Sequence, residues 1–289
     1  MSNRQARRQQ SRQSRQQRQS RASGGGGGRA PSGGGGGGGL FSTVMSPFVL
    51  GAAALAIALG GIVVFLAVTS DGGAETSEAV QSLEEAHENL PRDKADGYLL
   101  GVDDAPVKLI VFEDFQCPHC LRWAAMFEPT IVDEYVTTDM VQIEFRNLPV
   151  LGSESFDAAA ATYCTAEQNL FWDLHNEIYL IQARAGQLER GQSDAGRLTA
   201  PALRSVVEDL GADMDAYDAC INSPEPLAVV AEQEQQARSY GFSGTPSFVI
   251  NGAPQMGGAS TVDGWREILD AAYAEATGSE PDDGDDTAE

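Results

Sequence analysis

Residues 117–120 read Cys-Pro-His-Cys, and this segment of the sequence has the clearest chemistry. It follows a nearly continuous apolar run, Val107–Phe115, and precedes a helical pattern, Leu121–Glu128. Two cysteines at this spacing, where a strand turns into a helix, are typical of a pair that cycles between dithiol and disulfide. We therefore interpret Cys117 and Cys120 as a redox-active pair.

The position of the pair favours a thiolate at Cys117. The thiol lies at a helix N-terminus, where unpaired N–H groups and the helix dipole favour negative charge. Pro118 fits into the first helical turn without losing a hydrogen bond, and His119 would favour the thiolate further as a cation or as a hydrogen-bond donor. These effects lower the pKa of Cys117 and make the disulfide a stronger oxidant.

Two alternatives to redox chemistry are an inert structural disulfide and half of a zinc site. Zinc requires further ligands at suitable spacing. The remaining candidates, Cys164, Cys220, His87 and His175, are single and far apart in the sequence. We expect neither a metal nor an organic cofactor.

The elements around the pair predict an α/β domain with the order β-α-β, a helical block, then β-β-α. Val107–Asp114 is apolar enough for a strand buried in a sheet, and Val141–Asn147 alternates as a strand does. A helical block follows at about 152–240, then a strand at Ser247–Asn251 and a closing helix at Val262–Thr277. Strands that alternate with helices indicate an α/β sheet, and the block indicates an inserted all-helical subdomain.

Two acidic residues end the first strand, and one of them is a possible proton shuttle for the redox pair. Glu113 and Asp114 precede the pair directly, and a carboxylate beside a buried thiol can act as its base. Since strand side chains alternate between faces, only one of the two can point inward. The alternative is a solvated strand end.

Cys164 and Cys220 form a second possible pair. Thiols outside the membrane are usually paired, so four cysteines divide naturally into a catalytic and a structural pair. Two buried free cysteines, or a relay pair that exchanges with Cys117 and Cys120, are the alternatives. We favour a structural disulfide.

The first seventy residues predict a membrane anchor with a cytoplasmic tail. Residues 1–45 are an Arg/Gly-rich segment with too little apolar surface to fold. Residues 46–70 contain no charged side chain and hold an apolar core of about 21 residues, enough to cross a bilayer. All the positive charge near this span lies before it, so residues 71–289 are expected outside the cytoplasm.

Charge and composition divide the exported part and exclude some partners. The tail holds eight of the 19 basic residues and none of the 42 acidic ones, so the exported part is strongly acidic. It is not expected to bind nucleic acid. We interpret residues 71–96 as a linker, 97–277 as the folded domain and 278–289 as an acidic disordered tail.

A second specific signal lies close to the end of the domain. Gly244-Thr245-Pro246 stands immediately before an apolar strand, although a proline cannot donate to a sheet ladder. Together with the segment 112–120 (FEDFQCPHC) and the helical insertion, it resembles the DsbA-like thiol:disulfide oxidoreductases. The resemblance covers about residues 96–276, and the predicted anchor makes the chain more similar to membrane-tethered members.

The resemblance implies a thioredoxin-like fold interrupted by a helical domain, with an exposed Cys117 and a buried Cys120. It implies a cis bond between Thr245 and Pro246 that presents the backbone of Thr245 to an extended substrate segment. It also implies an oxidase that donates its disulfide to exported polypeptides and is reoxidised by a quinone-linked membrane oxidase. A reductase or isomerase of the same fold is the first alternative, and a non-catalytic peptide-binding or sensor domain is the second.

Overall fold

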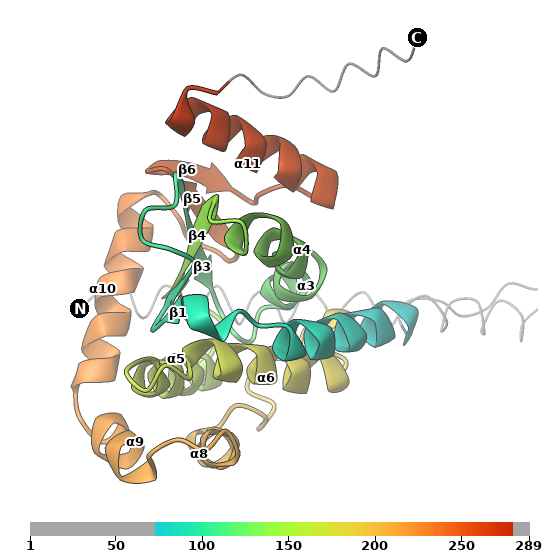
Figure 1. Ribbon diagram of the computed structural model, residues 1–289. Coiled ribbons are helices and arrows are strands. Elements are labelled where there is room, and N and C mark those ends of the chain that lie inside the picture. The colour runs from blue at the N-terminus through green and yellow to red at the C-terminus, as the bar shows by residue number, and fades with distance from the viewer. Residues whose placement is uncertain (1–72, 280–289) are drawn as a thin grey trace, which may run out of the picture. The chain divides into compact units, whose positions relative to one another are not determined.

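The computed structural model describes residues 73–279 (Figure 1). The predicted cytoplasmic tail, the predicted anchor at 46–70 and residues 280–289 of the acidic tail lie outside the described residues. Within 73–279, no helix is long and apolar enough to cross a membrane.

A six-stranded sheet in the order β1-β2-β4-β3-β5-β6 forms the centre of the domain. The strands are β1 (Ala95–Asp96), β2 (Leu99–Leu100), β3 (Val107–Glu113), β4 (Val141–Asn147), β5 (Ser247–Ile250) and β6 (Ala253–Met256). Strands β3 and β4 are parallel, and every other neighbouring pair is antiparallel. The central position of β3 places the residue that follows it in the middle of one sheet edge.

Strand β3 is buried on both faces over most of its length, which explains its apolar run Leu109–Phe112. Because successive side chains of a strand point to opposite faces, Leu109 and Val111 enter the large core while Phe112 packs with Ala237 in a smaller one. The central strands of such sheets are nearly continuous apolar runs.

Helices cover both faces of the sheet (Figure 1). Helices α3 (Pro118–Met126), α4 (Glu128–Ile131) and α11 (Val262–Thr277) lie on one side, and α10 (Glu225–Ser239) packs against β4 on the other. A π-helical stretch, Val132–Val136, leads from α4 towards β4. The sheet therefore lies between two helical layers.

The predicted helical block is present between β4 and β5. It consists of α5 (Ser153–Ala166), α6 (Phe171–Arg184), α7 (Gln187–Arg190), α8 (Ala200–Asp209), α9 (Met214–Ile221) and α10. Helix α5 contacts α6, α8, α9 and α10. Its buried alanines, Ala158, Ala159 and Ala161, leave room for these neighbours to approach closely.

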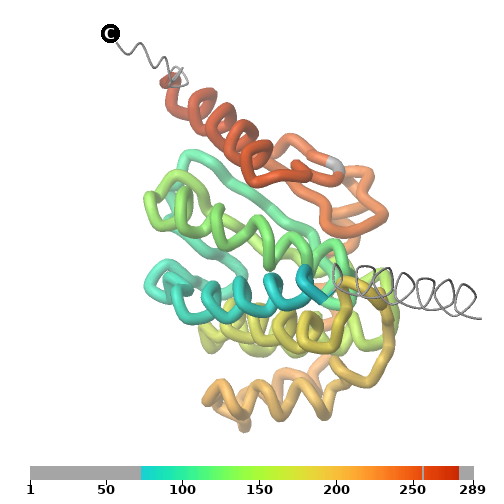
Figure 2. The backbone as a smooth tube through the Cα atoms, turned by 90° about the vertical axis from the view of Figure 1, so that its right-hand side faces the viewer, coloured from blue at the N-terminus to red at the C-terminus, as the bar shows by residue number. Residues whose placement is uncertain are grey.

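Residues 73–96, interpreted from the sequence as part of a linker, pack onto the domain. A helix at 73–88 buries Ala79 and Leu83 completely or nearly so. The Ser82 hydroxyl donates to the Ala125 carbonyl at 2.6 Å. Figure 2 shows this helix alongside the α3–α4 segment and α6. Two small apolar residues on one helix face are a weak sequence signal, because the rest of the segment is polar.

A disulfide joins Cys164 of α5 to Cys220 of α9, with a Cα–Cα distance of 5.6 Å. This is the pairing favoured above, and it leaves Cys117 and Cys120 as the free cysteines of the described residues. The bond ties two helices of the insertion together, away from the sheet.

We predict that Cys164→Ser with Cys220→Ser lowers the free energy of unfolding by about 4 kcal/mol, because the bond closes a loop with a sequence separation of 56. Urea denaturation of the double variant, compared with a Cys117→Ser/Cys120→Ser double variant as control, measures the loss. A difference below about 1 kcal/mol would show that the bond does not restrict the unfolded chain as the loop-closure argument requires.

Candidate active site

Cys117 caps the N-terminus of α3 directly after β3. Its backbone is extended (φ −78°, ψ 121°), and Pro118 occupies the first helical turn. The Cys117 carbonyl accepts the first helical hydrogen bond from the Leu121 N–H at 3.0 Å. The strand-to-helix turn predicted from the sequence therefore places the first sulfur at the helix end and Cys120 one turn inside.

The surroundings of Cys117 favour its thiolate. A hydrogen bond from Cys120 is the largest cause, followed among the favourable ones by the Thr245 side chain and the backbone N–H groups of Cys120 and His119. Together they overcome burial and lower the pKa of Cys117 to about 6. His119 thus contributes through its backbone, and its side chain is exposed.

Cys117 is covered more than the resemblance implies, with only 5% of its surface exposed. Its sulfur lies 3.4 Å from the Thr245 carbonyl oxygen. The loop before β5 therefore shields the sulfur that the resemblance describes as exposed.

Cys120 has the opposite electrostatic character. It is completely buried, and burial raises the pKa of its thiol well above the usual value, with Cys117 and the charge of Glu113 adding to the effect. A neutral thiol at Cys120 beside a thiolate at Cys117 is therefore the stable reduced form of the pair.

Glu113 and Asp114 are both buried, so the strand end is not solvated as the alternative assumed. Glu113 points towards the pair's side of the sheet and accepts a hydrogen bond from the Tyr179 hydroxyl at 2.7 Å. Asp114 accepts hydrogen bonds from Ser155 and from the backbone N–H groups of Val150 and Leu151. Asp114 therefore organises loops, and Glu113 is the acid that acts electrostatically on the pair.

Side chains of the helical insertion hold the loop before the pair. The Gln182 amide donates to the Phe115 carbonyl at 3.0 Å, and the Gln187 amide donates to the Gln116 carbonyl at 2.6 Å. The Gln116 amide donates in turn to the Ser155 hydroxyl. These buried bonds satisfy backbone groups that the end of β3 leaves without strand partners.

The bond between Thr245 and Pro246 is cis, and both residues line a groove beside the pair. The groove has a volume of about 410 Å³. Its walls carry aromatic side chains and few charges; the lining residues include His119, Arg122, Trp123, Phe127, Phe248 and Trp265. An extended apolar peptide segment suits such a groove, because backbone groups and alternate side chains can both be bound.

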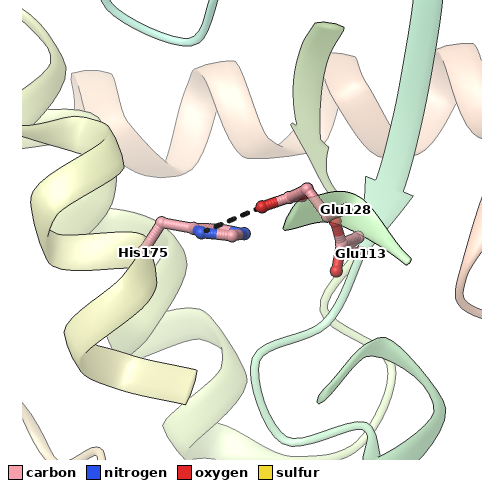
Figure 3. Close-up of side chains that lie close together, drawn as sticks. All are labelled: Glu113, Glu128 and His175. Carbon is pink, nitrogen blue, oxygen red and sulfur yellow. Dashed lines mark ion pairs between the residues drawn. The ribbon is translucent and has the colours of Figure 1, made fainter. Parts of the chain in front are cut away.

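Two buried residues of the site have no distinct sequence signal. Glu128 and His175 lie with Glu113 in a cluster whose candidate ligand atoms are all within 4.8 Å of one another (Figure 3). Glu128 is no candidate from the sequence alone, and His175 is there only a candidate zinc ligand far from the others. Only the spacing of Phe171, His175 and Tyr179, four residues apart, places the imidazole on the buried face of α6.

Carboxylates and imidazoles, the side-chain types of this cluster, can bind divalent cations. Neither Cys117 nor Cys120 lies in a group of candidate metal ligands among the described residues. Cys164 and Cys220, which a zinc site at the pair would need as ligands, are bonded to each other. The geometry at Cys117 and Cys120 suits thiol chemistry.

Comparison with known proteins agrees with this geometry. The thioredoxin family profile matches residues 93–271, more than half of the chain. A probable disulfide bond formation protein D of Bacillus anthracis is 31% identical over 157 residues, which is 53% of this chain and 69% of the relative. A putative protein-disulfide oxidoreductase of Rickettsia conorii is 28% identical over 58% of this chain and 57% of its own length.

Solved structures show the same fold at lower identity. BdbD from Bacillus subtilis, in its oxidised form, superposes with a TM-score of 0.53 at 20% identity, over 62% of this chain and 93% of that one. Wolbachia pipientis α-DsbA1 superposes with a TM-score of 0.52, also at 20% identity, over 68% of this chain and 98% of that one.

The predicted thioredoxin-like fold with a helical insertion is thus confirmed, and so is the predicted enzyme class. The anchor that would precede the fold stays a prediction. The chain belongs to the thioredoxin family and is a DsbA-like thiol:disulfide oxidoreductase.

Proposed function

We propose that this protein is a membrane-anchored oxidase that donates the Cys117–Cys120 disulfide to exported polypeptides outside the cytoplasm. The observation that carries the direction is the lowered pKa of Cys117. A thiolate exists only in the reduced pair, so whatever stabilises it favours reduction of the enzyme and oxidation of the substrate.

The reaction begins when a substrate thiolate attacks the Cys117 sulfur. The bond to Cys120 breaks, Cys120 takes up a proton, and a mixed disulfide forms between substrate and Cys117. A second substrate thiolate attacks the substrate sulfur of this bond and releases Cys117 as a thiolate. Oxidation of the two substrate thiols to a disulfide has then transferred two electrons to the enzyme pair. A quinone-linked membrane oxidase is the proposed acceptor that restores the disulfide.

The groove beside the pair supports a polypeptide substrate. Solvent reaches the lining residues His119, Phe127, Thr245 and Pro246 at least in part. The lining aromatic rings of Trp123, Phe248 and Trp265 are almost completely buried. The cysteines of an unfolded polypeptide lie in flexible, partly apolar segments that suit this groove. A small thiol needs no groove of this size.

The lowered pKa predicts how alkylation of the reduced enzyme depends on pH. Cys117 should react with iodoacetamide with a midpoint near pH 6, and Cys117→Ser should abolish this reaction. Cys120→Ala should shift the midpoint upward, because the largest stabilising hydrogen bond is lost. A wild-type midpoint near that of a free thiol, about 8.5, would contradict the thiolate assignment.

The same shift makes the stability of the reduced form depend on pH. Because folding lowers the pKa of Cys117, the stabilisation is complete above the ordinary value of 9.0 and is lost as the pH falls through about 6.

We expect a reduction potential above that of thioredoxin, about −270 mV, on equilibration with glutathione buffers at neutral pH. A lower value would favour the reductase interpretation.

We predict that Cys120→Ala accumulates mixed disulfides between Cys117 and exported proteins, because Cys120 can no longer attack the Cys117 sulfur and return the substrate as a thiol. Non-reducing electrophoresis of cells that express the variant measures these species. Cys117→Ala/Cys120→Ala is the matched control and should form none. If Cys120→Ala also forms none, the protein is not a catalyst on polypeptides, and the sensor alternative gains support.

The membrane anchor belongs to this proposal. Residues 46–70 carry no charge and the preceding tail is rich in arginine, a distribution that keeps the tail in the cytoplasm. We predict that deletion of residues 46–70 moves the protein from the membrane fraction to the soluble fraction after cell lysis. The full chain should stay with membranes in high salt, and its release by salt would contradict an apolar anchor.

A further inference from the structure

The buried cluster of Glu113, Glu128 and His175 has acceptor atoms that face one another without donors. Glu113 Oε1, Glu128 Oε2 and His175 Nε2 each lack a hydrogen-bond partner, and all three side chains are buried. Figure 3 shows the imidazole pointing towards the two carboxyl groups, which come from β3 and from the start of α4. Buried acceptors of this kind are costly unless protons or a cation lie between them.

Neighbouring hydrogen bonds define which atoms remain available. The Tyr179 hydroxyl donates to Glu113 Oε2 at 2.7 Å. His175 Nδ1 lies 2.9 Å from Asn176 Oδ1, an acceptor, so the ring carries its hydrogen on Nδ1 and keeps a lone pair on Nε2. Nδ1 also lies 4.0 Å from Glu128 Oε1, and Nε2 has no hydrogen-bond partner.

The pKa values of the cluster support protons as its occupants. Burial raises the pKa of Glu128 to about 8, and burial followed by the charge of Glu128 raises that of Glu113 well above its usual range. Burial lowers the pKa of His175 to about 4. At neutral pH Glu128 therefore holds a proton and the imidazole is neutral, and the pKa of Glu113 is shifted in the same direction as that of Glu128.

Protons also fit the surroundings better than a cation does. His175 packs against Phe115, Phe145, Phe171 and Trp172. Hard divalent cations take six or more oxygen ligands, and aromatic rings supply none.

The cluster connects the redox pair with a second cavity. Glu113 acts on Cys120 at one end. At the other end, Glu128 lines a cavity of about 320 Å³ together with Glu85 and Asp133, whose side chains are exposed to solvent. The Trp123 indole favours the charged form of both carboxyl groups, although its N–H makes no hydrogen bond with the described residues.

We propose that Glu128 is a proton-relay residue that passes protons between Glu113 and this cavity as the Cys117–Cys120 pair is reduced and oxidised. The proposal deepens the proposed function, because it needs a redox-active pair, whichever direction that pair runs in the cell.

The proton balance follows the redox step. When a thiolate breaks the disulfide, Cys120 leaves as a thiolate and takes the proton of Glu113. Glu113 recovers a proton from Glu128, and Glu128 recovers one from water in the cavity. On reoxidation each transfer reverses, and one proton leaves through the cavity.

The test is the rate at which dithiothreitol reduces the Cys117–Cys120 disulfide, followed by tryptophan fluorescence. We expect Glu128→Gln to slow this step about 10-fold at neutral pH, less than the roughly 100-fold or more typical of acid–base effects, because Glu113 remains. The ratio of wild-type to variant rates should fall towards one as the pH rises through about 8, where wild-type Glu128 loses its proton. Comparison at each pH cancels the ionisation of dithiothreitol itself.

Asp133→Asn is the matched control, since it removes a carboxyl group from the same cavity but not from the cluster. It should leave the rate unchanged. A rate ratio for Glu128→Gln near one at every pH, or one that does not change with pH, would overturn the relay. Loss of wild-type activity on treatment with EDTA would do the same, because it would identify a cation as the occupant.

Infrared difference spectra between oxidised and reduced protein give a second readout that does not depend on rates. We expect a C=O band of a protonated carboxyl group that disappears in Glu128→Gln, and its persistence would contradict the assignment. Neither readout uses a protein substrate. A reductase would therefore still show the relay, whereas a low reduction potential would refute the oxidase proposal alone.

Discussion

The chemistry of this protein depends on a helix N-terminus that is built into the edge of a buried sheet. Strand β3 ends at Glu113, and four residues later Cys117 caps α3. Because one helical turn separates the sulfurs, one thiol receives backbone N–H groups while the other enters the core. The same desolvation that raises the pKa of Cys120 therefore leaves Cys117 as the group that ionises.

The helical insertion contributes to this arrangement although it lies outside the sheet. Its glutamines, Gln182 and Gln187, bind the carbonyl groups of residues 115 and 116, and Ser155 binds Asp114. A turn between a strand and a helix has few internal hydrogen bonds, so its shape is maintained from outside. The Cys164–Cys220 disulfide holds the more distant helices of the insertion together.

The buried acids beside the pair have a cost in stability that their function explains. Unpartnered carboxyl and imidazole atoms in a core are unfavourable, and Glu113, Glu128 and His175 concentrate three of them in one place. A neutral, proton-holding cluster lowers that cost and keeps a proton within reach of a buried sulfur. Reduction and oxidation of the pair both require this proton to move.

Local sequence determined much of this protein: the α/β order, the redox pair and its position at a helix N-terminus, and the division into a redox and a structural pair of cysteines. These features depend on periodicity and on neighbours along the chain, so the sequence carries them directly. It did not distinguish Glu113 from Asp114, and it did not reveal Glu128, His175 or the packing of residues 73–88. Those depend on which side chains three separate elements bring together and on how completely they are buried. Only the tertiary structure decides that, because desolvation and proximity are properties of the assembled core.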